Sequence, residues 1–266
     1  MSYSASGLER FTYCSLNWWR GRNGARSEGD APREGHAAHA RKGRLVALWQ
    51  RLRAVYVRNF DSAFLYVLVA SAAALVAIDL LLVDVALEAG FFLLVLAFLC
   101  LLSALVYLLR AQRAKEQGDE VRLRSGVLEG ELVYSDLDRP AEALVSEKYD
   151  LTGRPDYMVR RDGHLIPVEV KTGKTPERPH PSHMIQAAAY ALLVKESTGD
   201  RPPYAVVSYP DRNFEVSFDE AAERQVLVTL LRMRLAETTG EVHRSHQSPA
   251  RCLGCSRREG CPERLA

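Results

Sequence analysis

The sequence has almost no excess of either charge and few cysteines for a chain of 266 residues. Its 35 basic and 33 acidic residues leave a formal net charge of +2, so overall charge gives no indication of a partner. Five cysteines are too few for a disulfide scaffold, and their spacing indicates a metal site assembled in a reducing compartment. The first residues, MSYSASGLERFTYC, lack a basic region followed by an apolar core, so we expect no secretory signal. Internal repeats are also lacking.

Two long apolar runs stand out against this balanced composition. Residues 64–83 carry one charge, Asp79, and residues 90–109 carry none, and each run is long enough to cross a bilayer as a helix. The alternative is a buried helical hairpin of a soluble core. Basic residues flank the pair on its outer sides, which predicts a two-pass membrane protein with both flanks in the cytoplasm. These basic residues are Arg51, Arg53, Arg58, Arg110, Arg113 and Lys115.

The chain therefore divides into an N-terminal segment 1–59, a membrane hairpin 60–110 and an α/β region 111–266. Residues 21–35 are rich in glycine and charge and predict a linker, followed by a helix from Glu34 into Trp49. Apolar periodicity predicts the remaining elements. The expected strands are 121–128, 131–136, 143–153, 155–161, 165–171, 204–209 and 214–218, and the expected helices are 183–197 and 219–238.

One predicted hairpin concentrates charged side chains. Asp162-Gly163 is a turn signal between two strand-like runs. Because side chains alternate along a strand, Glu169 and Lys171 point to one face, and we expect Asp156 of the preceding strand beside them. Ile166, Val168 and Val170 then point to the core.

Two carboxylates held together repel each other unless a cation lies between them. Mg²⁺ or Mn²⁺ is the natural partner of oxygen ligands, and a lysine beside such an ion can hold a water and offset charge on a phosphate oxygen. This set of groups suits metal-assisted hydrolysis of a phosphodiester. The alternative is a surface hairpin with solvated charges.

Four short motifs in order carry a family resemblance. They are G-x-x-x-H ending at His39, GRPD ending at Asp156, EVKTGK from Glu169, and Q-x-x-x-Y from Gln186 to Tyr190. This order resembles the PD-(D/E)XK nuclease superfamily in its RecB-like form. The resemblance implies a restriction-endonuclease-like mixed sheet flanked by helices, with the membrane hairpin inserted between the first two motifs.

The resemblance also implies roles for particular residues. The metal ligands would be His39, Asp156, Glu169 and the backbone carbonyl of Val170, and Lys171 would be the catalytic lysine. Three further residues would support the site or contact DNA: Gln186, Tyr190 and Lys174.

The C-terminal region reads C-x₂-C-x₅-C at Cys252, Cys255 and Cys261. Three thiolates need a fourth ligand, and Cys14 is the remaining cysteine outside the apolar runs. This distribution resembles the iron–sulfur branch of the superfamily, which includes the CRISPR-associated Cas-four exonucleases, and implies a [4Fe-4S] cluster. The alternative is a zinc site, because His243 and His246 precede Cys252.

Several basic and aromatic residues are candidates for contacts with a DNA backbone or unpaired bases. They are Arg154, Arg160, Arg161, Lys174, Arg257, Arg258, Trp18 and Trp19. The two tryptophans have an alternative interpretation, packing around the cluster or at the membrane surface.

The function predicted from these features is a membrane-anchored, metal-dependent deoxyribonuclease. The resemblance implies an exonuclease acting 5′ to 3′ on single-stranded DNA, in CRISPR adaptation, DNA processing or antiviral defence, with CRISPR adaptation proteins as further partners. Two alternatives stay open. One is a membrane-tethered DNA-binding scaffold, and the other is a zinc-stabilised membrane protein.

Overall fold

The computed structural model describes residues 2–24, 31–83, 86–126, 128–136 and 141–265, with only the backbone path for 31–40 and 124–125. The chain forms two compact units. One unit comprises residues 1–44 and 125–266, and the other comprises residues 45–124. Predicted helix 34–49 is present as the start of a longer helix, α3, which begins at Ala31 within the stretch expected to be a linker.

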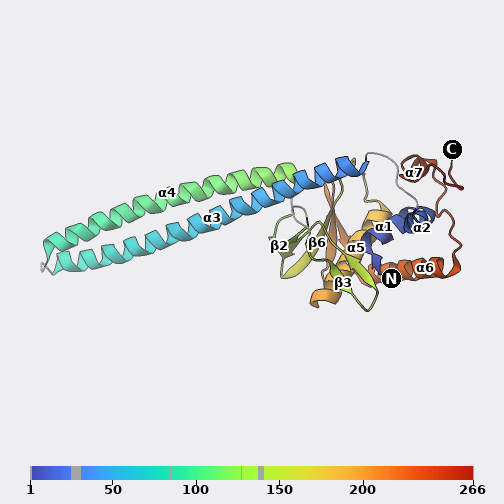
Figure 1. The fold of residues 1–266 in the computed structure, drawn as a ribbon. Coiled ribbons are helices and arrows are strands. Elements are labelled where there is room, and N and C mark those ends of the chain that lie inside the picture. Colours follow the sequence, from blue (N-terminus) through green and yellow to red (C-terminus); the bar gives the residue numbers. More distant parts are fainter. Residues whose placement is uncertain (1, 25–30, 84–85, 127, 137–140, 266) are drawn as a thin grey trace. The chain divides into compact units, whose positions relative to one another are not determined.

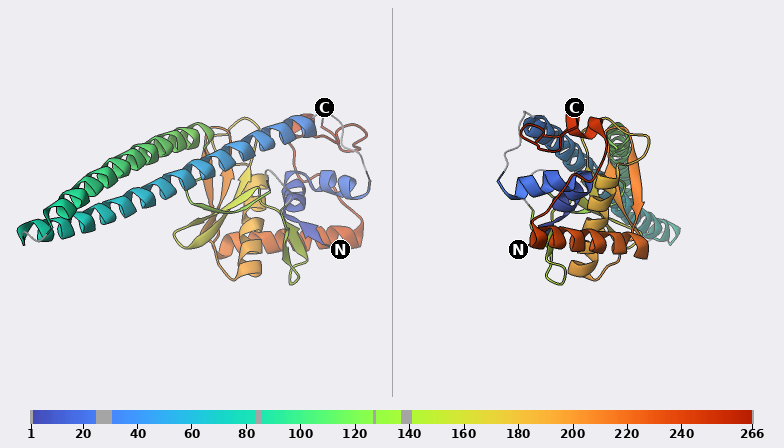
Figure 2. Two further views of the ribbon diagram at one scale, coloured as in Figure 1. Left: turned by 60° about the vertical axis from the view of Figure 1, so that its left-hand side comes forward. Right: turned by 90° about the vertical axis from the view of Figure 1, so that its right-hand side faces the viewer.

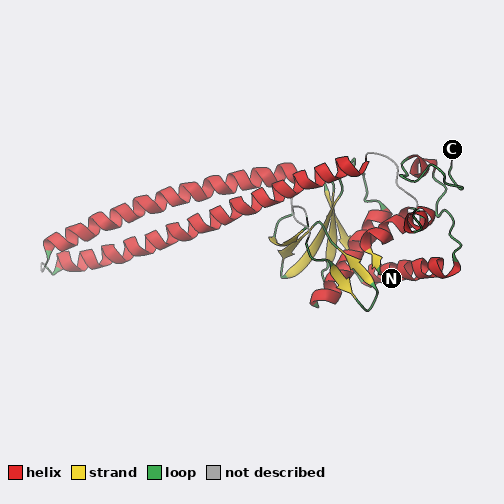
Figure 3. Ribbon diagram, viewed as in Figure 1, coloured by secondary structure: helices red, strands yellow, loops and turns green. Residues whose placement is uncertain are grey.

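The first unit is built on a mixed five-stranded sheet in the order β2-β5-β6-β7-β8 (Figures 1 and 3). Neighbouring strands are antiparallel except β6 and β7, which are parallel. A parallel pair needs a crossover, and helix α5 supplies it. The strands are β2 (Glu131–Ser135), β5 (Tyr157–Arg161), β6 (His164–Val170), β7 (Tyr204–Ser208) and β8 (Asn213–Ser217).

The predicted hairpin is formed by β5 and β6. Arg161 pairs with His164 across the two-residue turn, and Asp162 and Gly163 both have positive φ, 51° and 85°. Asp-Gly accepts this backbone at low cost, which explains the strength of the sequence signal. The turn fixes the register that brings Tyr157 opposite Val168, and with it the ends of the two strands that carry the candidate site.

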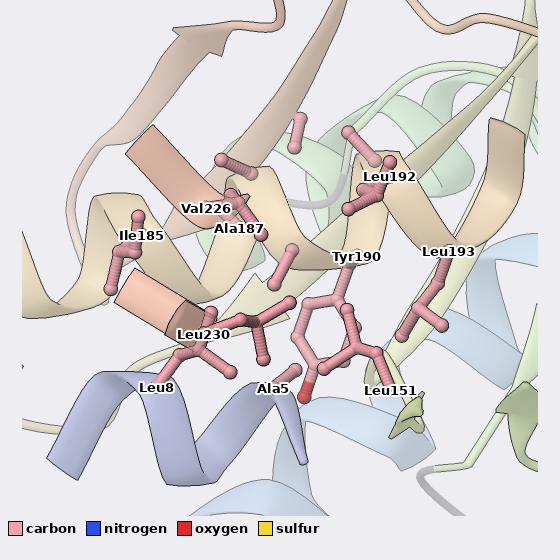
Figure 4. Close-up of a cluster of buried hydrophobic side chains, with 14 of the residues drawn as sticks. Ala5, Leu8, Leu151, Ile185, Ala187, Tyr190, Leu192, Leu193, Val226 and Leu230 are labelled. Atoms are coloured by element: carbon pink, nitrogen blue, oxygen red, sulfur yellow. The ribbon is translucent and has the colours of Figure 1, made fainter. Parts of the chain in front are cut away.

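Helix α5 (Pro181–Thr198) is the centre of the core. It is apolar on nearly all sides, as in IQAAAYALLV, because it lies between the sheet and the helices α1 and α6 (Figure 2). It begins with a proline in its first turn and ends at Gly199 in the left-handed conformation, φ 75°. Figure 4 shows Tyr190 and Leu193 of α5 against Leu151, with Ala5 and Leu8 of α1 nearby.

Helices α1 (Ala5–Tyr13) and α6 (Glu220–Thr239) complete this layer, each with a capped start. Ser4 accepts a hydrogen bond from the backbone N–H of Gly7, and Asp219 accepts one from Ala222. Both helices contact α5, and α1 also contacts α6. The N-terminal segment is thereby part of the nuclease-like core. Two short helices follow at the ends of this unit: α2 (Ser15–Arg22), whose Trp18 is part of the core, and α7 (Pro249–Leu253).

A second, small sheet in the order β1-β4-β3 corrects one predicted strand. The expected strand 143–153 is two antiparallel strands, β3 (Leu144–Ser146) and β4 (Leu151–Gly153), separated by a turn with Asp150 at φ 52°. Strand β1 (Tyr3–Ser4) pairs with β4 in parallel. Gly153 permits the close approach of β4 to α5, since a Cβ atom there would lie 2.8 Å from Cε1 of Tyr190.

The predicted strand 121–128 is also wrong over most of its length. Helix α4 (Leu87–Ser125) continues through it, because VRLRS follows a helical turn without a break before the glycine at 126. The remaining strands and the helices α5 and α6 lie where the periodicity predicted them. The mixed sheet flanked by helices confirms the expected fold class at this level.

The second unit is a hairpin of α4 and α3 (Ala31–Leu82), which run side by side in both Figures 1 and 2. Both helices are long and apolar enough to cross a membrane, with mean hydropathies of 2.4 and 2.9 in their most apolar windows. Within these windows only 11% and 17% of residues are buried. Small residues Ala70, Ala97 and Cys100 lie at their contact. Most of the large apolar side chains in the two runs are therefore exposed.

Candidate active site

Three predicted residues meet at the ends of β6 and α5. Lys171, which directly follows β6, donates from Nζ to Glu169 Oε1 at 3.2 Å and to Gln186 Oε1 at 2.7 Å. Gln186 donates from Nε2 to the same Glu169 oxygen at 2.9 Å. The alternation of the strand brings Glu169 and Lys171 to one side, as predicted. The amide of Gln186 holds the side chains of both Glu169 and Lys171 in place.

Asp156 reaches this cluster from the start of β5. Its Oδ2 accepts a hydrogen bond from the backbone N–H of Val170 at 2.6 Å, which ties it to the end of β6. Burial, followed by the negative charge of Asp156, raises the pKa of Glu169 to about 8, and Lys171 only partly opposes these effects. The two carboxylates therefore lie close enough to repel each other.

Tyr190 lies one helical turn beyond Gln186, and its hydroxyl accepts a hydrogen bond from Gln186 Nε2 at 3.1 Å. Both side chains are buried, with Gln186 2% exposed. Burial, followed by the charge of Glu169, raises the pKa of Tyr190, which keeps its hydroxyl neutral. Tyr190 and Gln186 are thus neutral, buried side chains that hold each other in place next to Glu169.

Sequence reasoning missed one acidic member of the cluster, Glu9. It comes from α1, and its Oε1 accepts a hydrogen bond from Lys171 Nζ at 3.0 Å and lies 3.3 Å from Nε2 of His183. The pair Glu9 and Lys171 is separated by 162 positions in the chain. Nothing in the local spacing of LERF marks this contact. The only signal for Glu9 in the sequence is that this amphipathic segment carries one acidic residue next to its apolar face.

The charge state of Lys171 follows from these neighbours. Burial alone would lower its pKa, but Glu169 and Glu9 together raise it above the ordinary value. The three hydrogens of the ammonium have three partners, which are Glu169, Glu9 and Gln186. Lys171 is therefore a charged, fully oriented ammonium beside the buried carboxylates.

The residues present fit a hard divalent cation on chemical grounds, since two neighbouring carboxylates, one of them buried, offer hard oxygen ligands at one place. Yet within the residues that the structure describes, no group of three or more His, Cys, Asp or Glu side chains is arranged to hold one metal ion. The predicted ligand His39 lies outside the described side chains, although its backbone belongs to α3. Val170, the fourth predicted ligand, ends β6 next to Asp156.

The four predicted cluster cysteines line one cavity. Cys14 lies between α1 and α2, and the other three belong to the C-terminal segment around α7. Burial raises the pKa of the Cys255 thiol, and the other three cysteines add to this effect. Five arginines line the same cavity and can offset negative charge on the sulfurs: Arg20, Arg244, Arg257, Arg258 and Arg264.

The two histidines of the zinc alternative have different surroundings. His246 also lines the cysteine cavity, and burial lowers its pKa. His243 is mostly exposed and pairs through Nδ1 with Glu263 at 2.7 Å. His246 is therefore the histidine that remains as a candidate ligand.

Several predicted DNA contacts are placed elsewhere than expected. Arg160 and Arg161 lie at the turn end of the β5–β6 hairpin, about 16 Å along β5 from Asp156. Trp18 is buried in the core beside Phe11, with ring centroids 5.2 Å apart, so it cannot stack on a base. Trp18 therefore matches the alternative interpretation of packing, while contacts of the exposed Arg160 and Arg161 with DNA stay a prediction.

The remaining candidates stay accessible. Trp19 is partly exposed beside Arg22, whereas Arg154 and Lys174 are exposed in loops next to the cluster ends of β5 and β6. Arg257 and Arg258 line the cysteine cavity.

An open cleft adjoins the candidate site on the side of His183. It runs between α1, the start of α5 and α7, and its lining contains basic and neutral polar groups but no acidic residue. The polar lining residues are Thr12, Tyr13, His180, Ser182, His183 and Arg251. A cleft of this character next to a carboxylate pair can accept a polyanion.

Comparisons with known proteins agree with this arrangement. The family model of the PD-(D/E)XK nuclease superfamily matches residues 2–262. The chain is 32% identical over 154 residues to the CRISPR-associated exonuclease Cas4/endonuclease Cas1 fusion of Myxococcus xanthus (strain DK1622), covering 53% of this chain and 27% of that protein. It is 25% identical over 122 residues to the CRISPR-associated exonuclease Cas4 of Francisella tularensis subsp. novicida (strain U112), covering 46% and 61%.

A second Cas4/Cas1 fusion, from Leptospira interrogans serogroup Icterohaemorrhagiae serovar Lai (strain 56601), is 29% identical over 119 residues, covering 42% and 22%. The chain thus spans less than two thirds of the length of each of these curated relatives. The family model, in contrast, extends over nearly the whole sequence, including the segments that carry Glu9, Asp156 and the C-terminal cysteines. The chain belongs to the PD-(D/E)XK nuclease superfamily.

Proposed function

We propose that the protein is a membrane-anchored, metal-dependent DNA exonuclease. The observation that carries this proposal is the meeting of Asp156, Glu169 and Lys171 at the ends of β5 and β6, with Gln186 bonded to both members of the Glu169–Lys171 pair. A surface hairpin would leave these charges in solvent. Here Glu169 is 8% exposed, and a buried acid of this kind is characteristic of a reaction centre.

Each residue has a role that follows from its contacts. Asp156 and Glu169 hold Mg²⁺ or Mn²⁺ together with Val170 and His39, and the bound ion supplies an activated water and stabilises charge on the phosphate. Lys171 orients the attacking water and offsets charge on the phosphoryl oxygens. Gln186 and Tyr190 keep Glu169 and Lys171 in place, and Lys174 contacts the DNA backbone from its exposed loop.

The substrate is proposed to be single-stranded DNA, degraded from 5′ to 3′. The relatives described as CRISPR-associated exonucleases support an exonuclease, and the acid-free cleft lined by His183 supports a polyanionic substrate. The strand form and the direction rest on the family resemblance alone. The same relatives suggest a place in CRISPR adaptation, DNA processing or antiviral defence, with CRISPR adaptation proteins as partners.

The cysteine cavity is proposed to bind a [4Fe-4S] cluster through Cys14, Cys252, Cys255 and Cys261. The four thiols line one cavity, and four thiolates are the ligand set of a [4Fe-4S] cluster. Arginines around the cavity match the negative charge of thiolate ligation. A visible absorption band of the purified protein, with iron and sulfide rather than zinc on elemental analysis, is the expected result.

The helices α3 and α4 are proposed to be a two-pass anchor that leaves the nuclease domain in the cytoplasm. The exposed apolar side chains along both helices support it, since a soluble protein rarely presents so many. The basic flanks support the orientation. The protein should resist carbonate extraction from membranes, and protease added to right-side-out vesicles should leave the nuclease domain intact. Release by carbonate would contradict the anchor.

The decisive experiment follows degradation of end-labelled single-stranded DNA by the full-length protein in detergent with Mn²⁺. The parent should release labelled nucleotides, and Asp156→Ala and Lys171→Ala should lower the rate by about 10³-fold or more. Exposed residues of the same charge serve as controls: Glu220→Ala on α6 and Lys148→Ala before β4 should leave the rate unchanged.

The variants also separate the two alternative functions. If the parent binds DNA but does not cut it, the protein is a scaffold. If the purified protein contains zinc and neither binds nor cuts DNA, it is a zinc-stabilised membrane protein. Cleavage at the parental rate by Asp156→Ala or Lys171→Ala would overturn the site assignment.

A further inference from the structure

A line of polar contacts connects the candidate catalytic lysine to a buried tyrosine that directly follows β7. The Tyr209 hydroxyl lies 2.6 Å from Nδ1 of His183. Nε2 of His183 lies 3.3 Å from Oε1 of Glu9, and the same Glu9 oxygen accepts from Lys171 Nζ at 3.0 Å. Four elements of the fold meet in this line: α1, α5 and the ends of β6 and β7. Neither the sequence motifs nor the comparisons assign a role to His183 or Tyr209.

The direction of each hydrogen bond follows from the chemistry of the groups. Burial, followed by the positive charge of Lys171, lowers the pKa of His183 to about 3, so its imidazole is neutral and carries one N–H. A carboxylate at Glu9 can only accept, so the hydrogen of His183 is on Nε2. Nδ1 is then an acceptor, and the Tyr209 hydroxyl donates to it. Tyr209 thereby selects the tautomer that can bond Glu9.

The pair is held rigidly. Tyr209 is 1% exposed, and the ring of Phe214 packs edge-on against it at 5.6 Å. The ring of His180 packs edge-on against His183 at 5.2 Å. The charged or titratable groups that face His183 are Glu9 from α1, Lys171 after β6, Tyr209 after β7 and His180 before α5. His183 therefore has one orientation available, and it points at Glu9.

The line matters because the Lys171 ammonium has three hydrogens and three partners. When Glu169 binds a metal ion and a substrate oxygen approaches, the Lys171 ammonium keeps its orientation only if its other two partners, Glu9 and Gln186, stay fixed. Gln186 is fixed by Glu169 and by Tyr190. Glu9, whose side chain is 23% exposed, has His183 as its contact besides Lys171 among those described.

We propose that His183 is a positioning residue, oriented by Tyr209, that fixes the Glu9 carboxylate and through it the Lys171 ammonium in the reactive geometry. This inference rests on the proposed nuclease function for its kinetic consequence. Its structural core, a neutral His183 with the hydrogen on Nε2, stands apart from that function.

The kinetic test compares His183→Ala, His183→Gln and Tyr209→Phe in Mn²⁺-dependent cleavage of single-stranded DNA by the full-length protein. Gln carries an N–H at nearly the position of Nε2, so it should restore most of the activity that Ala loses. We expect kcat to fall about 30-fold or more for His183→Ala and about 3- to 10-fold for both His183→Gln and Tyr209→Phe, because one positioning hydrogen bond is lost or weakened. KM for DNA should change less than kcat, since His183 lines the proposed DNA cleft but its N–H is assigned to Glu9, and Tyr209 does not line that cleft.

Matched controls lie on the same strands away from the line. Tyr204→Phe at the other end of β7 and His164→Gln at the start of β6 should keep the parental kcat and KM. Parental kcat in His183→Ala would overturn the proposal. Equal losses in His183→Gln and His183→Ala, with parental thermal stability in both, would overturn it as well, and so would a loss confined to KM.

The second measurement is ¹⁵N NMR of the full-length protein with labelled histidine. His183 should be neutral with its hydrogen on Nε2 between pH 5 and 8, and Tyr209→Phe should shift it towards a mixture of tautomers; His183→Gln identifies the signal. A protonated His183, or an Nδ1–H tautomer in the parent, would overturn the proposal. If the parent cleaves no DNA, the proposed function fails, and the tautomer still decides whether this hydrogen-bond line exists.

Discussion

The reaction-centre residues and the cysteine cavity draw on the same two parts of the chain but are stabilised differently. Both join the N-terminal segment to later residues, through Glu9 in one case and Cys14 in the other. Around Glu169 the polar side chains bond to one another directly. Around the thiols, the contacts run instead between the surrounding residues, such as Tyr13 Oη to the backbone carbonyl of Arg251 at 2.7 Å.

More such contacts surround the cysteine cavity. Arg20 donates to the backbone carbonyls of Arg257 and Glu259, and Arg257 donates to Asn17 Oδ1 at 3.1 Å. These hydrogen bonds hold together the residues that surround the cavity, whereas the thiols inside it contribute little to one another's stability. The proposed reaction centre is thus pre-assembled by its own side chains, whereas the cysteine region is proposed to gain its stability from a bound metal group. Variants of the first should change activity, and variants of the second should change stability.

The largest expected effect separates activity from stability at Glu169. Glu169→Gln should lower the cleavage rate by about 10³-fold, because the proposed metal loses a ligand charge. The same variant should raise the Tm of the metal-free protein at pH 7 by roughly 2–4 °C, because burial and Asp156 raise the pKa of Glu169 and make its ionisation in the folded state costly, whereas an amide carries no such cost. Cleavage assays and thermal unfolding in EDTA measure the two changes. A lower Tm would show that the carboxylate itself stabilises the fold.

The next effect belongs to the cysteine cavity. Cys255→Ser should remove the visible absorption band and lower the free energy of unfolding by ~2 kcal/mol or more, because the metal group then no longer joins the N-terminal and C-terminal segments. Thermal unfolding should show a Tm several degrees lower, beyond any change in Lys171→Ala. Cys100→Ser, in the helical hairpin, is the matched control and should keep the band. Equal Tm values for Cys255→Ser and the parent would remove the contrast between the two regions.

An intermediate effect tests how the core supports the reaction centre. In Gly153→Ala the new Cβ would lie 2.8 Å from Tyr190 Cε1 and 2.9 Å from Leu193 Cδ1, so β4 or α5 must shift. We expect a loss of about 1–3 kcal/mol in the free energy of unfolding and a several-fold lower kcat, since Tyr190 contacts Gln186. Gly173→Ala, which has open space around it, is the control. Parental stability in Gly153→Ala would contradict the packing described.

The smallest effect is a pH dependence outside both regions. Glu223 of α6 accepts from Lys195 of α5 at 2.6 Å and from Arg201 at 2.7 Å, and these bonds hold its pKa below the ordinary value of 4.5 despite partial burial. A depressed pKa stabilises the fold above the unfolded-state pKa, and this stability is lost as the pH falls through the folded-state value. Glu223→Gln should therefore cost about 0.5–1 kcal/mol at pH 7 and much less at pH 3. Chemical denaturation at both pH values measures the difference, and a cost that grows at pH 3 would contradict the sign.

Local sequence signals predicted the parts of the fold and site that depend on short-range geometry. Asp162-Gly163 determined a hairpin because few other dipeptides accept two positive φ values, and strand alternation then placed Glu169 beside Lys171. Helical spacing in the same way aligned Gln186 with Tyr190. Periodicity erred where a turn or a helix end lacked a signal, at Asp150 and at the end of α4.

Contacts between distant segments were not predictable in this way. Glu9 reaches Lys171 only because α1 packs on α5. His183 contacts Tyr209 only because Tyr209, which directly follows β7, lies beside the start of α5. A single sequence contains no spacing that encodes either contact. For Trp18 the sequence left base stacking and packing open, and the core buries its ring.

The central claim is that Asp156 and Glu169 bind a divalent cation beside Lys171. Electron paramagnetic resonance of Mn²⁺ titrated into the full-length protein tests it most directly, since free Mn²⁺ is counted apart from bound Mn²⁺. The parent should bind one or two Mn²⁺ ions at micromolar concentrations, and Asp156→Ala should bind at least about tenfold more weakly, while Glu220→Ala binds as the parent does. Equal Mn²⁺ binding by the parent and Asp156→Ala would contradict the claim.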